Sequence, residues 1–341
     1  MKSAEVIQAP DIPVEPLPRL GFLGTGWIGR MRLQALLEAN VAQYCVVHDI
    51  SSEAAAAAAA LATGIDIHRS LADLLDMDLD GVVIATPSAL HADQCLEALA
   101  RGKAVFCQKP LARTRAETLR VVQAARAADK LLAVDFSYRY LAGMKQLRAM
   151  IGAGELGEIF AADLIFHNAY GPDKSWFYDV SFAGGGCVMD LGIHLVDLAL
   201  WLLGQGEVER VSSSLFRKGA RLQPPYAEVE DFATADFRLK HTHLRLCCSW
   251  NLHAGRDAVI EAHFHGTRGG AALRNVKGSF YDFEIYRFNG TAQQRLAGYP
   301  DSWGGRALID WAAKLAGGST FDSGIEQVVQ VAEVIDRIYS R

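Results

Sequence analysis

The chain has 341 residues, of which 50% are hydrophobic and 21% charged, and its 34 basic and 39 acidic residues give a formal net charge of −5. This composition excludes general disorder, and the absence of a long basic run argues against nucleic acid or an anionic membrane as a partner. One hydrophobic core rarely organises so many residues, so we expect two domains and small-molecule partners.

The amino-terminal segment and the cysteines bear on the cellular compartment. Residues 1–18 hold four of the ten prolines and lack the apolar core of a signal peptide, so we expect a flexible arm on a cytoplasmic protein. No apolar run is expected to reach the roughly 20 residues that cross a bilayer. The six scattered cysteines lack the paired spacing of a zinc site and are expected to be reduced and mostly structural.

Strand-like and helical patterns alternate through the first 135 residues. The apolar, strand-like runs are 20–23, 44–49, 81–86, 103–108 and 130–136. Helical patterns separate them, including an alanine tract at 54–60 that Ser52 is expected to cap. Such alternation predicts a doubly wound parallel sheet whose ligand lies beyond the carboxyl ends of the strands.

A glycine-rich turn follows the first of these strands. Residues 24–29 read GTGWIG, and Asp49 ends the second strand 20 residues after Gly29. Glycines in this pattern let the backbone approach a pyrophosphate at a helix N-terminus, and an acid at this distance can hold a ribose hydroxyl. The order of elements favours dinucleotide binding over a chance motif. No Lys or Arg follows Asp49 closely, so NAD is favoured over NADP, although Arg30 and Arg32 leave the choice open.

The second half of the chain has a different pattern. In residues 233–239 and 244–250 apolar and polar side chains alternate with a period of two, which predicts a largely antiparallel sheet with one covered face. The pairs His241-x-His243 and His263-x-His265 lie in this region. We predict no metal site there, because no further ligand completes either set and outward-facing histidines are common.

One apolar stretch carries three ionisable residues. Residues 184–204 read GGGCVMDLGIHLVDLALWLLG, and Asp190, His194 and Asp197 fall on one stripe of a helix at 100° per residue. The spacing lets Asp190 touch His194. The stripe is either solvated or functional, and Asp197 is interpreted as a surface or structural acid.

Several motifs together resemble the Gfo/Idh/MocA oxidoreductases. These motifs are GTGWIG with Asp49, IATPSALH (84–91), GKAVFCQKP (102–110), DFSYRY (135–140), LGEI (156–159) and GGGCVMDLGIH (184–194). The resemblance implies an α/β Rossmann domain that binds NAD(P) at 19–138. It also implies an α+β domain at 139–341, with an open, mostly antiparallel sheet for substrate binding and for a homodimer or homotetramer.

The resemblance also implies a set of site residues. Lys109, Asp190 and His194 correspond to the catalytic set, with His194 as general base and Lys109 facing a developing alkoxide. The positions expected to bind the cofactor are Gly24, Gly26, Trp27, Ile28, Gly29, Asp49, Thr86, Pro87, His91, Gln108 and Lys109. Gln108 departs from the family, which usually has Glu there.

The sequence also suggests substrate contacts and a reaction. Tyr138, Arg139, Asn168 and Trp176 are expected to line the cleft, with packing roles as the alternative. The resemblance implies hydride transfer between a nicotinamide and a secondary alcohol or ketone of a sugar, cyclic polyol or related compound. The alternatives are a non-sugar substrate, or a non-catalytic regulator that binds dinucleotide, for which Gln108 leaves room.

Overall fold

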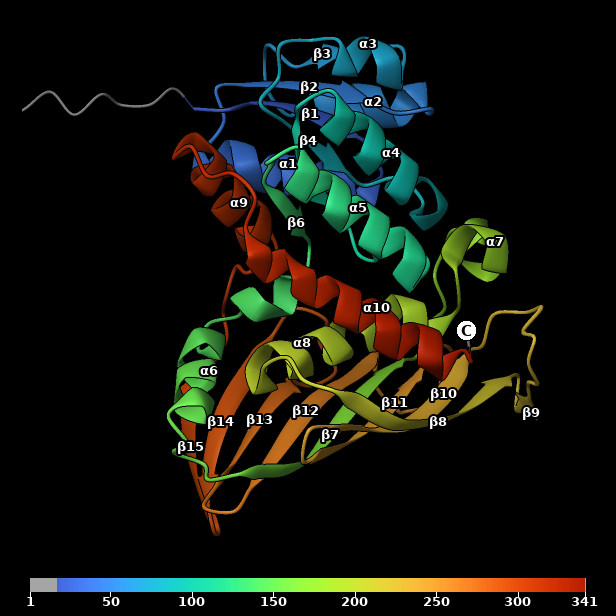
Figure 1. The fold of residues 1–341 in the computed structure, drawn as a ribbon, viewed down its shortest axis with the longest axis vertical. Coiled ribbons are helices and arrows are strands. Elements are labelled where there is room, and N and C mark those ends of the chain that lie inside the picture. The colour runs from blue at the N-terminus through green and yellow to red at the C-terminus, as the bar shows by residue number, and fades with distance from the viewer. Residues whose placement is uncertain (1–16, 341) are drawn as a thin grey trace, which may run out of the picture.

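The computed structural model describes residues 17–340 and arranges them around two sheets, one above the other in Figure 1. The expected flexible arm at residues 1–18 lies outside the described residues except for its last two positions. The upper unit is formed mainly by the first third of the chain and the lower unit by the rest.

The upper sheet is entirely parallel and has six strands. Its strands are β1 (Arg19–Leu23), β2 (Tyr44–His48), β3 (Asp66–Ile67), β4 (Gly81–Ile84), β5 (Ala104–Cys107) and β6 (Leu132–Val134). The order β3-β2-β1-β4-β5-β6 reverses direction between β1 and β4. This is the doubly wound arrangement predicted from the alternating pattern, and its crevice lies where the order reverses.

Five helices connect these strands. They are α1 (Trp27–Ala39), α2 (Ser52–Ala59), α3 (Leu71–Leu75), α4 (Ser88–Ala100) and α5 (Arg115–Ala127). The alanine tract forms α2 as predicted, but the predicted cap is wrong by one residue. Ser51 Oγ accepts a hydrogen bond from the Ala54 N–H at 3.2 Å, and Ser52 is the first helical residue. The sequence patterns had not indicated the short elements β3 and α3.

A helix from the far end of the chain completes the core of the upper unit. Helix α9 (Arg306–Ala316) buries Trp311 against β5, where its ring lies 5.8 Å from the ring of Phe106. Gly81 in β4 leaves the necessary space, because a Cβ there would lie 2.6 Å from the Trp311 ring. The predicted boundary after residue 138 stays a prediction, and the upper core draws on residues well beyond it.

The lower sheet has nine strands. They are β7 (Ile159–Asn168), β8 (Val208–Arg217), β9 (Ala220–Arg221), β10 (Phe232–Leu239), β11 (Thr242–Ser249), β12 (Ala258–Gly266), β13 (Gly270–Asn275), β14 (Phe283–Asn289) and β15 (Ala292–Ala297). Their order is β15-β14-β13-β12-β7-β11-β10-β8-β9, and every pairing is antiparallel except β7 with β11. The predicted period of two is confirmed, since alternate residues of β10 are buried.

Helical segments lie above this sheet, and the longer ones cover one of its faces (Figure 1). They are η1 (Ser137–Tyr140), α6 (Met144–Gly152), η2 (Ser175–Tyr178), α7 (Val180–Ala183), η3 (Val188–Gly192), α8 (Ile193–Leu203), η4 (Ser323–Glu326) and α10 (Gln327–Ile338). Helix α10 packs on α5 and α8 and thereby joins the two units (Figure 1). The opposite sheet face is polar: Asp163 binds His265 at 3.0 Å and Arg245 at 2.6 Å, and His263 contacts Glu261 at 2.9 Å.

The expectation that no apolar run is long enough for a membrane is wrong. Residues 180–203, which comprise α7, a bend at 184–186, η3 and α8, form a 24-residue stretch that by length and composition could cross a bilayer. Three ionisable residues interrupt the stretch, yet its mean hydropathy is still 1.7. The fold buries 78% of its most apolar window, which is typical of a core helix. All six cysteines are free, and five are buried.

Candidate active site

The site is centred on an ion pair between the two units. Lys109 follows β5 of the upper sheet, and Asp190 lies in η3 above the lower sheet. Lys109 Nζ donates to Asp190 Oδ1 at 2.8 Å and to the Asp190 backbone oxygen at 2.6 Å. Trp250 Nε1 donates to Asp190 Oδ2 at 3.1 Å, so both carboxylate oxygens are held. Each side chain of the ion pair keeps 17% of its surface exposed, which leaves the pair open to a ligand.

His194 lies next to this pair at the start of α8. Its ring meets the Tyr138 ring edge-on at 5.1 Å, and Nδ1 is enclosed with no hydrogen-bond partner among the described residues. Burial, and then the positive charges of Lys109 and Arg32, hold the pKa of His194 well below its usual 6.5. The imidazole is therefore neutral near pH 7 and able to accept a proton.

The predicted contact between Asp190 and His194 is replaced by other contacts. The hydrogen bonds of the Asp190 carboxylate go to Lys109 and Trp250 instead. The cause is local: residues 188–192 form a π turn, in which the Ile193 N–H reaches back five residues to the oxygen of Val188. A wider turn changes the angle between positions 190 and 194, and π turns are frequent at functional sites.

The glycine-rich turn forms an open cradle at the start of α1. Gly24 has φ +83°, and a Cβ there would lie 2.6 Å from the Ala85 oxygen, so only glycine fits. A Cβ on Gly29 would lie 2.1 Å from the Gly24 oxygen. Among residues 17–340, a Cβ at Gly26 would meet nothing within 4 Å, and no side chain caps the helix that follows. The first N–H groups of α1 thus face open space, which fits the pyrophosphate of a dinucleotide.

Asp49 stands beside this cradle at the end of β2. Its carboxylate accepts hydrogen bonds from the N–H groups of Thr25 at 2.6 Å and Ser51 at 2.8 Å. These two bonds fix its position and leave acceptor capacity for a ribose. The next side chain, Ile50, is 97% exposed, and Trp27 is 59% exposed above the turn, while Ile28 is partly buried.

The loops after β4 and β5 are tied to each other by His91. One ring nitrogen lies 2.6 Å from the Pro110 oxygen and the other 2.7 Å from the Thr86 oxygen. Burial lowers the pKa of His91, whose two ring nitrogens are both engaged within the protein. Thr86 Oγ1 donates to Gln94, and Pro87 precedes α4. His91 thus holds in place the two loops that carry the other expected cofactor residues.

A buried cluster next to Lys109 was missed from the sequence. The carboxylate of Asp135, whose side chain is fully buried, binds Arg32 Nε at 2.6 Å, Ser137 Oγ at 2.5 Å and the amide of Gln108. Asp135 belongs to the motif DFSYRY, but nothing in its spacing indicates a partner 103 residues away. A carboxylate is therefore present beside Gln108, although residue 108 is not Glu.

The expected substrate residues fall into two groups. Tyr138 is buried against His194, and Arg139 is committed to an ion pair with the buried Asp197, with Nε 2.7 Å from Oδ2. Asp197 is thus structural, as interpreted. Asn168 ends β7 with its Oδ1 enclosed and without a partner among the described residues, and Trp176 stacks on Phe177 at 3.8 Å.

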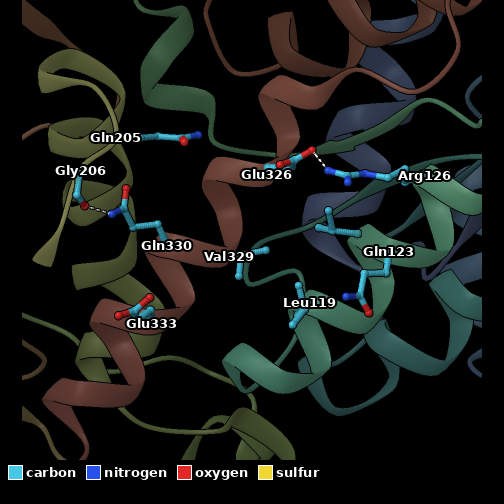
Figure 2. Close-up of a pocket in the computed structure, with 10 residues that line it drawn as sticks. Leu119, Gln123, Arg126, Gln205, Gly206, Glu326, Val329, Gln330 and Glu333 are labelled. Carbon is cyan, nitrogen blue, oxygen red and sulfur yellow. Dashed lines mark hydrogen bonds and ion pairs between the residues drawn. The ribbon is translucent and has the colours of Figure 1, made fainter.

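A cavity of about 560 Å³ lies apart from this site, between α5 and α10. Figure 2 shows Leu119, Gln123 and Arg126 on one wall facing Val329, Gln330 and Glu333 on the other. None of the predicted site residues lines it. The cavity follows the joint between the two units and plays no part in the geometry described above.

Comparison with known sequences gives matches over both units. Residues 19–136 match an oxidoreductase family described by its NAD-binding Rossmann fold, and residues 144–272 match the GFO/IDH/MocA C-terminal domain. A putative UDP-kanosamine synthase oxidoreductase subunit of Amycolatopsis mediterranei (strain S699) is 32% identical over 272 residues, which are 75% of each chain. The D-glucoside 3-dehydrogenase of Escherichia coli (strain K12) is 31% identical over 212 residues, which are 59% of this chain and 60% of that one.

Solved structures share the whole fold. A levoglucosan dehydrogenase in complex with NADH and levoglucosan superimposes with a TM-score of 0.79 at 22% identity, over 95% of this chain and 97% of that one. The 3-ketoreductase KijD10 of Actinomadura kijaniata, in complex with NADP and TDP-benzene, gives a TM-score of 0.80 at 20% identity over the same shares. With both of its units matched, the chain belongs to the Gfo/Idh/MocA family of NAD-binding oxidoreductases.

Proposed function

We propose that the protein transfers a hydride between NAD and a secondary alcohol or ketone of a sugar, cyclic polyol or related compound. The observation that carries this proposal is the contact of Lys109 with Asp190 beside a neutral His194. An ammonium group, a carboxylate and an unprotonated imidazole at one opening are what the oxidation of an alcohol requires.

Each group has a role in this scheme. The N–H groups after Gly26 would hold the pyrophosphate, and Asp49 would hold the ribose. When bound, the nicotinamide supplies or accepts the hydride. His194 takes the hydroxyl proton during oxidation and returns it during reduction. Lys109 stabilises negative charge on the substrate oxygen, and Asp190 keeps Lys109 in place while offering an acceptor to a substrate hydroxyl.

NAD is proposed over NADP on the surroundings of Asp49. A carboxylate repels the 2′-phosphate of NADP, and the side chain that follows, Ile50, is apolar and exposed. Arg32, one of the two cations that left the choice open, is engaged by Asp135 and Ser137. Arg30, in α1, is the other cation and the remaining candidate for a contact with the 2′-phosphate of NADP.

A hydroxyl-rich substrate is supported by relatives named for sugars and polyols, including the glucoside and levoglucosan dehydrogenases. Within the site, Asn168 and Trp176 are the proposed substrate contacts, because an enclosed amide oxygen without a partner suits a hydroxyl donor. Tyr138 and Arg139 are proposed to shape the cleft from behind. A non-catalytic regulator is disfavoured, since it has no need of the Lys109–Asp190 pair.

Assembly and compartment are proposed on general grounds. The polar outer face of the lower sheet, with its paired histidines and acids, is the proposed contact surface of a homodimer or homotetramer. Six free cysteines suit a reducing compartment, so we propose the cytoplasm.

The test is a panel of sugars, cyclic polyols and non-sugar alcohols, with NAD and NADP in parallel, followed by nicotinamide absorbance. We expect turnover of at least one sugar or polyol, and a loss of about 10²-fold or more in kcat for His194→Ala, with NAD affinity unchanged. His241→Ala, in the exposed turn between β10 and β11, is the matched control and should keep full activity. Tight NAD binding without turnover of any compound would favour the regulator instead.

A further inference from the structure

Three successive N–H groups ahead of Asp190 are held by a single residue. The N–H groups of Gly186 and Val188 donate to the Glu230 carboxylate at 3.0 and 2.8 Å, and the N–H of Cys187 donates to the Glu230 backbone oxygen at 3.1 Å. Glu230 lies just before β10 and is 1% exposed. A carboxylate at the start of a helical run satisfies N–H groups that have no other partner and meets the positive end of the helix dipole.

Tyr339, directly after α10, fixes this carboxylate in turn. Its hydroxyl donates to Glu230 Oε1 at 2.7 Å and accepts from the N–H of Gly186 at 3.2 Å. Burial, and then the charge of Glu230, raise the pKa of Tyr339 well above 10, so the hydroxyl keeps its proton and remains a donor. We call Glu230 and Tyr339, with the N–H groups of residues 186–188, the Glu230 clamp.

The clamp explains two of the three glycines at 184–186. A Cβ on Gly185 would lie 2.2 Å from the Tyr339 hydroxyl, and a Cβ on Gly186 would lie 1.9 Å from the Glu230 oxygen. Both contacts are too close for any side chain, so the glycines let the clamp approach the backbone. The requirement comes from close packing, which a sequence pattern does not reveal.

The clamp is connected to the reactive carboxylate of Asp190 and to one of its two partners, Trp250. The N–H of Asp190 donates to the Gly186 oxygen at 3.0 Å, so Asp190 lies one turn beyond Gly186. The residue after Glu230, Asp231, accepts the backbone N–H of Trp250 at 2.8 Å, and Trp250 holds the other oxygen of Asp190. One short segment therefore sets where Asp190 stands and where Trp250 meets it.

We propose that Glu230, held by Tyr339, is a positioning residue that fixes the π turn so that Asp190 meets Lys109. The inference rests on the proposed function for its effect on turnover, but the geometry of the clamp is independent of it. Because misplacing a reacting group by about 1 Å can cost about 10²-fold in rate, loosening the clamp should lower kcat without touching the dinucleotide cradle.

The test uses Tyr339→Phe in the full chain, with Tyr140→Phe as the matched control. Tyr140 also donates its hydroxyl to a partly buried carboxylate at 3.0 Å, but that carboxylate, Asp310, belongs to α9. Hydrogen exchange of a peptide covering residues 184–192 gives a readout that needs no substrate. We expect Tyr339→Phe to speed that exchange about tenfold, and Tyr140→Phe to leave it unchanged.

Turnover gives the second readout. We expect Tyr339→Phe to lower kcat about tenfold with unchanged NAD affinity, and to have no further effect in an Asp190→Asn background, because both changes act through one carboxylate. Glu230→Gln should reproduce the exchange result more strongly. Unchanged exchange in both variants, or an equal loss of kcat with and without Asp190, would overturn the proposal. Failure of the wild type to turn over any panel compound would refute the proposed function alone.

Discussion

Lys109, Asp190 and His194 illustrate what the family resemblance could predict. The resemblance placed all three in one site, and the structure brings Lys109 to 2.8 Å from Asp190 with His194 adjacent. The partners of Asp190 were a different matter. Trp250, which binds Asp190, and Arg32, which binds Asp135 in the cluster beside Lys109, come from distant segments, and no local spacing connects positions 60 or 103 residues apart.

The lowered pKa of His194 has a consequence for pH dependence. A base that stays neutral well below pH 6.5 should keep kcat/KM for alcohol oxidation level down through that pH, with its acid limb lower. The stability of the fold should also decrease toward acid pH, because the imidazole of the unfolded chain binds a proton near pH 6.5 and the folded one does not. The free energy of unfolding should therefore fall as the pH drops below about 6.5.

Two profiles check this expectation. The pH profile of kcat/KM for the wild type gives the acid limb, and denaturant unfolding of wild type and His194→Asn between pH 7 and 5 gives the stability difference. The variant should show a shallower decline than the wild type. An acid limb at or above pH 6.5 would contradict the neutral, buried imidazole.

In the proposed function, Asp49 is the residue that favours NAD over NADP. Removing its carboxylate in Asp49→Ala should weaken NAD at least tenfold, the value of roughly one charged hydrogen bond, and should affect NADP less. Titrations of both dinucleotides measure the ratio. Glu53→Ala removes a neighbouring acid from the first turn of α2 and serves as the control for charge alone. Equal losses for NAD and NADP would contradict the assignment.

At the scale of helices and strands, the periodicity of the sequence predicted the regular elements. It missed the places where an element departs from regular geometry. The period of two identified β10 and β11, because each strand buries one face. The apolar run around His194 was predicted as one regular helix, yet it contains a π turn at 188–192. The same residues could form a regular α-helix or a π turn. We attribute the π turn to Glu230 and Tyr339, which approach from elsewhere in the chain.

Whole-molecule architecture was predicted in outline only. Two units with a parallel and a mostly antiparallel sheet follow from the patterns, but the return of α9 to the upper core does not. Its apolar face would suit either sheet. The pocket left by Gly81 and the ring of Phe106 select the upper one, and both features exist only after folding.

The anchoring role of α9 can be measured by replacing its tryptophan. Trp311→Ala should lower the free energy of unfolding by about 3–5 kcal/mol, the usual loss for a large aromatic side chain that leaves a cavity. Denaturant unfolding without dinucleotide measures it. Trp27→Ala, at a position 59% exposed, should change stability by less than about 0.5 kcal/mol. A loss below about 1 kcal/mol for Trp311 would mean that α9 is not an anchor.

The return of α9 also bears on protein engineering. Exchanging dinucleotide-binding halves between relatives is an obvious way to alter coenzyme choice, and residue 138 looks like a convenient seam. A graft cut there would strip Trp311 and its neighbours from the transplanted half and expose an apolar hollow over β4 and β5. A chimera should therefore carry residues 306–316 from the same parent as residues 19–138.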